Sequence, residues 1–171
     1  VEHVAAVNDV PYGTVYWYSF YRNFDEVGGL FLQKATHDLD YVQFLLGQQP
    51  KQICAMHANR IYGSAGTVYP GNHANDLKCV DCGEQEFCPE SPWNLFYERR
   101  EGGAFEPMPD RYCLFAEGIR NEDFGQCIVE YEGGAQANYV QNFFVRHGAG
   151  RRGARLFGYE GTIEFDWYKN E

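Results

Sequence analysis

Strand-like runs separated by glycine turns occupy the end of the chain, and they constrain its fold more than any other feature. The four runs are 125–131, 135–145, 154–159 and 162–167. Glu132-Gly133-Gly134 joins the first two and Glu160-Gly161 joins the last two, as expected for β-hairpins. Alternating apolar and polar residues flank these turns, which indicates strands with one buried face. We therefore expect consecutive antiparallel strands here.

The first part of the chain supplies elements that would complete such a sheet. An aromatic and β-branched run at 13–24 predicts a strand, and 52–61 alternates as a second strand does. Between them, 37–46 predicts a helix. Residues 62–112 are dense in Gly, Pro, Asn and Cys and lack periodicity, which indicates a cysteine-rich insertion between strands. The prediction is an α+β fold, with an open, mainly antiparallel β-sheet covered on one face by a helix.

The predicted helix has recognisable end signals. Thr36 fits an N-cap, and Gly47 fits a C-terminal stop. On this interpretation His37 and Asp40 lie three residues apart on one exposed face at the mouth of the helix. Polar side chains gathered at such an exposed position are more consistent with a functional site than with packing in the core.

Length and charge limit the class of protein. The 171 residues suffice for one domain with a substantial core. The formal net charge of −10 argues against a nucleic-acid partner, because such binders need a basic face. No apolar run approaches the roughly 20 residues of a membrane helix, so no membrane partner is expected. The chain begins at Val1 rather than at a methionine, which indicates a fragment or a processed product.

A dinucleotide fingerprint is missing from the setting that it requires. The spacing G-x-G-x-x-G occurs at 148–153, but the residues after it predict another strand and not a helix. A flexible, basic hairpin loop is the better interpretation, with phosphate contact as the alternative. The concentrated positive patch of the chain surrounds this loop and either faces a substrate or is solvated. Its members are Arg146, His147, Arg151 and Arg152.

Four of the six cysteines are grouped as metal ligands often are: Cys79, Cys82, Cys88 and Cys113. A C-x2-C pair offers two thiolates from one turn, and four thiolates suit a tetrahedral structural zinc. Free thiols and disulfides are the alternatives, and disulfides are disfavoured in a cytosolic protein. His73 is a substitute ligand should Cys113 lie too far away. Cys54 and Cys127 lie in predicted strands and fit small buried hydrophobic residues better than ligands.

Several motifs follow one another in a specific order. Gly28 to Gly47 carries a Gly-Gly turn, then a histidine, and then an aspartate three residues later. Gln49-Pro50-Lys51-Gln52-Ile53 leads into the next strand, and 130–134 and 155–164 form two later hairpins. This order resembles the C-terminal domain of the Gfo/Idh/MocA family, which includes glucose–fructose oxidoreductase and inositol dehydrogenase. The likeness covers roughly residues 12–167, and Cys88-Pro89-Glu90-Ser91 resembles a cysteine run of several members.

The resemblance implies an organisation and a function. The chain 1–171 would be a single substrate-binding and oligomerisation domain of an enzyme that oxidises a sugar, cyclitol or related polyol. NAD or NADP would be bound mainly by an N-terminal Rossmann domain that this chain lacks, so the chain alone is expected to be inactive. In the family the uncovered sheet face packs against another subunit, which implies a homo-oligomer. A cytoplasmic location is expected.

The resemblance also implies catalytic residues. His37 matches the family's histidine, and an imidazole can take the hydroxyl proton of an alcohol as hydride leaves. Asp40 would orient that ring or hold a substrate hydroxyl, or else serve the helix dipole. Lys34 would bind a substrate carboxylate or hydroxyl, or else be solvated. Gln33 stands where inositol dehydrogenase-like members have an aspartate, and this departure supports a rival function. The rival is a non-catalytic, zinc-stapled binding or assembly module.

Overall fold

The computed structural model describes residues 1–64, 66, 73–94 and 111–170. The chain divides into two compact units. Val1–Gly13, Gly28–Ala58 and Glu122–Glu171 form the first, which we call the sheet unit. Thr14–Val27 and Asn59–Asn121 form the second, which we call the cysteine unit.

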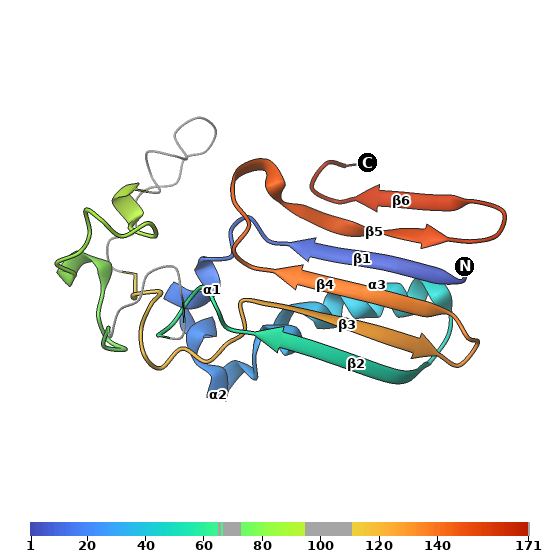
Figure 1. Cartoon of the computed structure of the whole chain (residues 1–171), viewed down its shortest axis with the longest axis horizontal. Coiled ribbons are helices and arrows are strands. Elements are labelled where there is room, and N and C mark those ends of the chain that lie inside the picture. The colour runs from blue at the N-terminus through green and yellow to red at the C-terminus, as the bar shows by residue number, and fades with distance from the viewer. Residues whose placement is uncertain (65, 67–72, 95–110, 171) are drawn as a thin grey trace. The chain divides into compact units, whose positions relative to one another are not determined.

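A six-stranded sheet makes up most of the sheet unit (Figure 1). In spatial order its strands are β2 (Pro50–Ala58), β3 (Phe124–Tyr131), β4 (Gln136–Asn142), β1 (His3–Asp9), β5 (Arg151–Phe157) and β6 (Thr162–Asp166). β1 runs parallel to β4, and every other neighbouring pair is antiparallel. The predicted α+β fold with an open, mainly antiparallel sheet is confirmed.

The C-terminal runs are strands as predicted, but their order in the sheet differs from a simple succession of hairpins. β1 lies between β4 and β5, because Ala6 pairs with Tyr139 on one side and with Ala154 on the other. Sequence analysis predicts no strand at 3–9, where small residues give a weak signal. The connection from β4 to β5 crosses β1 and contains the short 3-10 helix η4 (His147–Ala149). The predicted hairpin loop at 148–153 is therefore a crossover that leads into β5.

One helix, α3 (Thr36–Leu46), packs on a face of the sheet and follows directly from a π-helical turn, η2 (Phe31–Ala35). The predicted N-cap at Thr36 is wrong, because the helical backbone is already formed at Leu30. The Thr36 hydroxyl instead donates to the Leu32 carbonyl one turn earlier, at 3.1 Å. The predicted stop is confirmed: Gly47 has a φ of +64°, which glycine adopts without strain.

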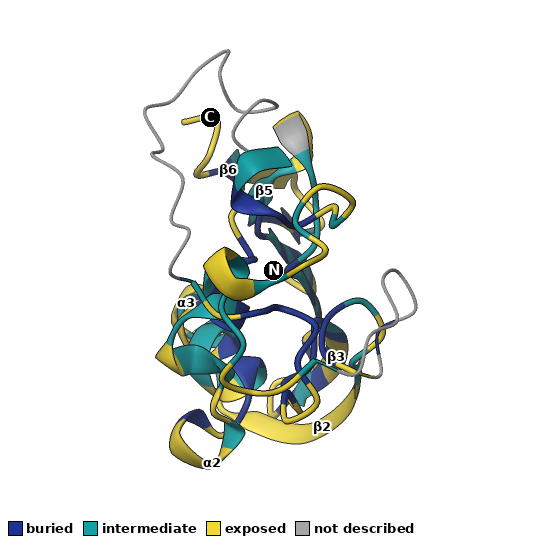
Figure 2. Cartoon of the chain, turned by 90° about the vertical axis from the view of Figure 1, so that its left-hand side faces the viewer, coloured by how far each residue is buried: buried dark blue, intermediate teal, exposed yellow. Residues whose placement is uncertain are grey.

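The core of the sheet unit lies between α3 and the sheet, and the strands alternate accordingly. In β3, Cys127 and Val129 are buried toward the helix, whereas Ile128 is 60% exposed on the opposite face. The edge strand β2 is exposed along most of its length (Figure 2). Apolar side chains from both layers form one cluster. It contains Val4, Ala6, Ala35, Val42, Cys127, Val129, Tyr131, Ala135, Ala137, Tyr139, Ala154 and Leu156.

The strand predicted at 13–24 is wrong, since these residues form short helices in the cysteine unit. They are α1 (Val15–Tyr18), η1 (Phe20–Arg22) and α2 (Phe24–Val27). The aromatic run reads as a strand by propensity, but a short apolar run can equally be a buried helical turn. Trp17 is fully buried, and its ring centroid lies 4.4 Å from that of Tyr62. The described helices include none that is long and apolar enough to cross a membrane. That 62–112 is an insertion stays a prediction.

Candidate functional site in the sheet unit

A row of polar side chains crosses the sheet where β1 and β4 end and β5 begins. Asn8 of β1 pairs with Gln141 of β4 on one side and with Arg152 of β5 on the other. Asn8 and Gln141 are buried, although the preceding residues on the same face are apolar. Buried polar groups need hydrogen-bond partners, so the side chains of this row must find theirs on helix α3, which packs on the same face of the sheet.

Asp38 of α3 is the partner of this row. It is fully buried, and its Oδ2 accepts hydrogen bonds from Asn8 Nδ2 at 2.7 Å and from the Tyr139 hydroxyl at 2.9 Å. Its Oδ1 accepts a hydrogen bond from Arg152 Nε at 2.9 Å and forms an ion pair with Arg152 Nη2 at 2.8 Å. Donors from three strands thus converge on one carboxylate, which is what a buried charge requires. We call Asp38, Asn8, Tyr139 and Arg152 the Asp38 cluster.

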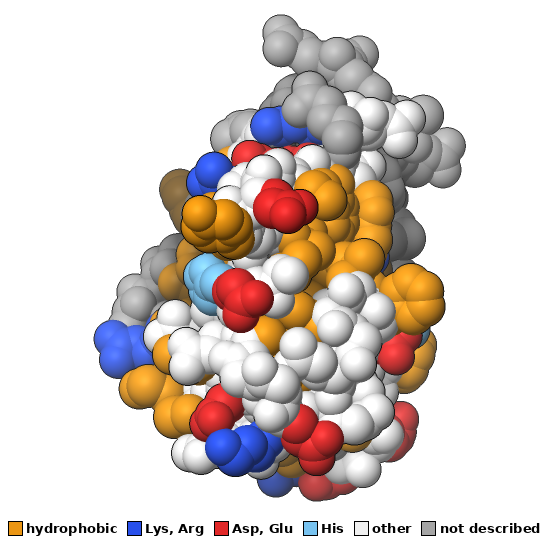
Figure 3. Space-filling model, turned by 90° about the vertical axis from the view of Figure 1, so that its right-hand side faces the viewer, with side chains coloured by type: hydrophobic (Ala, Val, Ile, Leu, Met, Phe, Trp, Pro, Cys, Tyr) orange, Lys and Arg blue, Asp and Glu red, His pale blue; other side chains and the backbone are white. Residues whose placement is uncertain are grey.

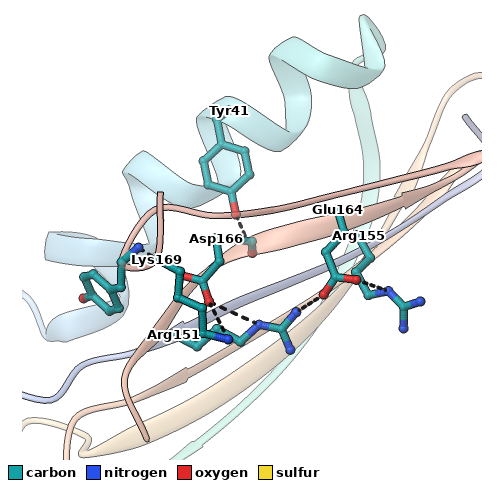
Figure 4. A network of polar contacts seen from close by, with 8 residues as sticks. Tyr41, Arg151, Arg155, Glu164, Asp166 and Lys169 are labelled. Atoms are coloured by element: carbon teal, nitrogen blue, oxygen red, sulfur yellow. Dashed lines mark hydrogen bonds and ion pairs between the residues drawn. The ribbon is translucent and has the colours of Figure 1, made fainter. Parts of the chain in front are cut away.

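The ionisation of the neighbouring groups follows from burial and from the charge of Asp38. Burial raises the pKa of Tyr139, and the carboxylate of Asp38 raises it further. Both causes also raise the pKa of Tyr41, whose hydroxyl donates to the Gly153 carbonyl at 3.2 Å (Figure 4). Burial by itself would lower the pKa of Arg152, but its bonds to Asp38 outweigh that effect and the net shift is upward. The ion pair is therefore maintained in the fold.

Lys34 is the predicted site residue that the structure brings to this cluster. Its side chain is partly buried, and its pKa is lowered. Burial is the largest cause and the positive charge of Arg152 adds to it, whereas the negative charge of Asp38 raises the pKa. Both charges are therefore close enough to act on the Lys34 ammonium.

His37 and Asp40 lie on the exposed side of α3. No hydrogen bond or ion pair joins these two side chains within the part of the chain that the structure describes. Their predicted cooperation stays a prediction. Because the helix begins near Leu30, they sit in its interior and not at its mouth. The imidazole of His37 is accessible to a bound molecule.

Sequence reasoning missed Asp38 as the centre of the cluster, although the sequence carries a signal for it. Ala35 and Val42 are buried on the helix stripe that faces the sheet, and Asp38 occupies the position between them. A carboxylate on an apolar stripe must find buried donors. The pairing with Arg152 could not be predicted, because it depends on β1 separating β4 from β5.

The predicted positive patch is divided among different partners. Arg152 faces Asp38, whereas Arg151 lies on the opposite face of β5 and contacts Glu164 at 2.6 Å (Figure 4). Glu164 also contacts Arg155 at 3.2 Å, and Arg151 lies 3.8 Å from Asp166. The side chain of His147 lies outside the described part of the chain. Two members of the patch, Arg151 and Arg152, are therefore paired with carboxylates.

The cysteines predicted to bind zinc line one cavity in the cysteine unit, with a volume of about 20 Å³. All six cysteines of the chain are free, and burial raises the pKa of Cys88 to about 12 and that of Cys113 to about 11. Among the described residues, no group of three or more His, Cys, Asp or Glu side chains is arranged to hold a metal ion. The predicted zinc site is therefore not confirmed.

Known proteins resemble this chain in sequence and in fold. A Bacillus subtilis (strain 168) protein, YteT, named as an oxidoreductase, is 29% identical over 143 residues, which are 77% of this chain and 33% of YteT. An oxidoreductase domain protein from Kribbella flavida superposes with a TM-score of 0.60 at 14% identity, over 98% of this chain and 35% of its own. Scyllo-inositol dehydrogenase from Lactobacillus casei, with NAD(H) and scyllo-inositol bound, gives a TM-score of 0.53 at 14% identity.

These relatives are longer proteins. The match covers 96% of this chain but 33% of the scyllo-inositol dehydrogenase, so the chain spans about a third of the length of its relatives. At such low identity the solved structures establish the fold alone. The family model described as the Gfo/Idh/MocA C-terminal domain matches residues 1–164, and the chain therefore belongs to the Gfo/Idh/MocA oxidoreductase family as a C-terminal domain.

Proposed function

We propose that this chain is the substrate-binding and oligomerisation domain of an NAD(P)-dependent oxidoreductase that acts on a sugar, cyclitol or related polyol. The observation that carries the proposal is the Asp38 cluster, which anchors α3 directly beside the exposed His37. Anchoring of this kind positions a catalytic side chain. The scyllo-inositol dehydrogenase relative supports the substrate class and the cofactor.

The proposed roles follow from charge and exposure. His37 takes the proton of the substrate hydroxyl as hydride leaves for the nicotinamide. The Lys34 ammonium would donate a hydrogen bond to a substrate hydroxyl or carboxylate. Asp40 would orient the imidazole once substrate is bound. NAD or NADP would be held mainly by an N-terminal Rossmann domain of the whole protein.

The test uses the whole protein and a panel of sugars, cyclitols and polyols, with NAD and with NADP. Replacing His37 by Ala should lower kcat about 10²–10⁴-fold, the usual contribution of general acid–base catalysis. His57→Ala is the matched control, because His57 is an exposed histidine on β2. Lys34→Met should raise KM, and Asp40→Asn should lower kcat less than His37→Ala. A His37→Ala enzyme with the kcat of the parent would refute the catalytic assignment.

We propose further that the face of the sheet opposite α3 packs against a second copy. Ile128 and Met56 on that face are 60% and 68% exposed. Figure 3 views the chain from the side that lies at the right in Figure 1, so the hydrophobic side chains exposed there belong to a different surface from this sheet face. Ile128→Glu should shift the mass in light scattering toward the monomer. Ile53→Glu is the control, because Ile53 is 57% exposed but pairs with Val129 on the helix side. Equal behaviour of the two variants would contradict the proposal.

The rival proposal, a non-catalytic zinc-stapled assembly module, is supported by the four thiols around one cavity and by Gln33 in place of an aspartate. A whole protein that binds NAD(P) yet oxidises nothing in the panel would favour it. The free state of all six cysteines supports the cytoplasmic location that we propose for either function.

A further inference from the structure

The four thiols of the cysteine unit come from two backbone segments that the fold holds together. Cys79 and Cys113 lie next to the antiparallel bridge between Lys78 and Tyr112. Cys79 N–H donates to the Arg111 carbonyl at 2.9 Å, and Cys113 N–H donates to the Leu77 carbonyl at 2.9 Å. The backbone that presents these two thiols is thus fixed without any link between the sulfurs.

The other two thiols come from turns that follow Cys79. The 3-10 helix η3 (Cys79–Asp81) ends with the Cys82 N–H donating to the Cys79 carbonyl at 3.3 Å. Cys88 N–H donates to the Glu84 carbonyl at 3.0 Å, and Asn94 Nδ2 donates to the Cys88 carbonyl at 2.8 Å. A C-x2-C pair on a tight turn is the geometry by which short loops offer two thiolates to one ion.

Two arginines face this thiol set, although the chain as a whole is acidic. Burial raises the pKa of the Cys79 and Cys88 thiols, whereas the positive charge of Arg111 acts to lower it, and Arg111 Nη2 donates to the Glu90 carbonyl. Arg22 acts on Cys113, and its guanidinium lies 5.1 Å from the centre of the Tyr112 ring. The Nη1 and Nη2 atoms of Arg22 are buried and have no hydrogen-bond partner among the described residues. A buried guanidinium is stabilised when a negative charge lies close to it.

We propose that Cys79, Cys82, Cys88 and Cys113 bind one structural zinc ion as thiolates. A zinc ion with four thiolates carries a net charge of −2, which would be complementary to the positive charges of Arg22 and Arg111. The ion deprotonates its thiol ligands outright, and four sulfur ligands favour zinc over magnesium or calcium. The cavity of about 20 Å³ between the thiols has room for one ion. Because the four thiols are not arranged around an ion in the structure, binding would require their side chains to turn toward this cavity. This site does not depend on the catalytic role proposed for His37.

Metal analysis of the chain purified without chelators tests this proposal. One zinc per chain is expected, and cobalt exchanged into the site should show the absorption of a tetrahedral thiolate complex. Absence of zinc, together with failure of added zinc to bind at micromolar concentration, would overturn the proposal. Disulfides among the four cysteines in the protein as purified, detected by mass spectrometry, would also overturn it.

Variants separate the site from adventitious zinc binding. Cys82→Ser and Cys88→Ser should reduce bound zinc at least tenfold, whereas Cys54→Ser, an exposed cysteine of the sheet unit, should leave it unchanged. Equal losses in all three variants would refute the assignment. Because a ligand variant can fail to fold, the wild-type chain is also stripped with a chelator. Zinc, but not magnesium, should then restore its thermal stability; no difference between the two ions would overturn the proposal.

Discussion

Replacing Asp38 by Asn is the sharpest test of how the fold holds its candidate site. The substitution conserves shape but removes the negative charge and turns one acceptor into a donor. Three hydrogen bonds, from Asn8, Tyr139 and Arg152, end on this carboxylate together with a second ion-pair contact to Arg152, and an amide can accept through its single oxygen only. Breaking a buried ion pair by removing one partner costs about 3–5 kcal/mol. Arg152 is partly exposed, which favours the lower end of that range.

The assay is urea unfolding followed by circular dichroism and tryptophan fluorescence. With a urea slope of about 1–3 kcal/mol/M, the loss should lower the unfolding midpoint by roughly 1 M or more at unchanged slope. Trp167 reports on the site, because the Arg152 guanidinium lies 4.9 Å from its ring centre. Asp40→Asn is the matched control on the same helix. Asp40 is exposed, so its substitution should change the free energy of unfolding by less than about 0.5 kcal/mol.

A double-mutant cycle with Arg152→Met then isolates the ion pair. If Asp38 and Arg152 stabilise one another, the two losses should be non-additive, with a coupling of about 1 kcal/mol or more. An Asp38→Asn loss below about 1 kcal/mol, equal to that of the exposed Asp40, would refute the view that this carboxylate anchors α3.

Two further predictions concern the sheet unit. Gly153→Ala should destabilise it by about 1–3 kcal/mol in urea unfolding, because an added Cβ would lie 2.0 Å from the Phe165 carbonyl oxygen of β6. The control is Gly148→Ala, which should be nearly neutral because the space around Gly148 is open. Stability should also fall as pH rises above about 10, where tyrosines of the unfolded chain ionise. In the folded chain the raised pKa of Tyr139 keeps its hydroxyl protonated, so its contribution is complete below pH 10 and is lost as the pH rises toward the folded value. The unfolding midpoint measured from pH 8 to 11 should decline less steeply in Tyr139→Phe, and an equal decline would show that Tyr139 contributes nothing to it.

The sheet was predictable where local signals are strong. Glycine turns and alternation identify the strands that became β3 to β6, and the left-handed Gly47 ends α3 as predicted. β1 was not predicted, because its place between β4 and β5 depends on pairing with residues more than a hundred positions away. The aromatic run at 13–24 misleads for a related reason: its rings fill a core, and propensity does not distinguish a buried strand from buried helical turns.

The site was predictable in part. The sequence identifies Lys34, His37 and Asp40 because they stand in a motif, and the structure brings Lys34 to the Asp38 cluster. Among the described residues, no hydrogen bond or ion pair connects His37 with Asp40. Arg152 was assigned to a loop patch because its strand could not be located without β1. The general lesson is that a charged residue on an apolar helix stripe, here Asp38, is as informative as a motif.

The position of His37 follows from the burial of its neighbour. Consecutive residues of an α-helix point about 100° apart, so a helix that directs Asp38 into the sheet must direct His37 away from it. A rotation of α3 that buried His37 would withdraw Asp38 from Asn8, Tyr139 and Arg152 and leave a charge in the core without partners. The interactions that stabilise the sheet unit therefore also determine that α3 exposes His37, the residue for which we propose a catalytic role.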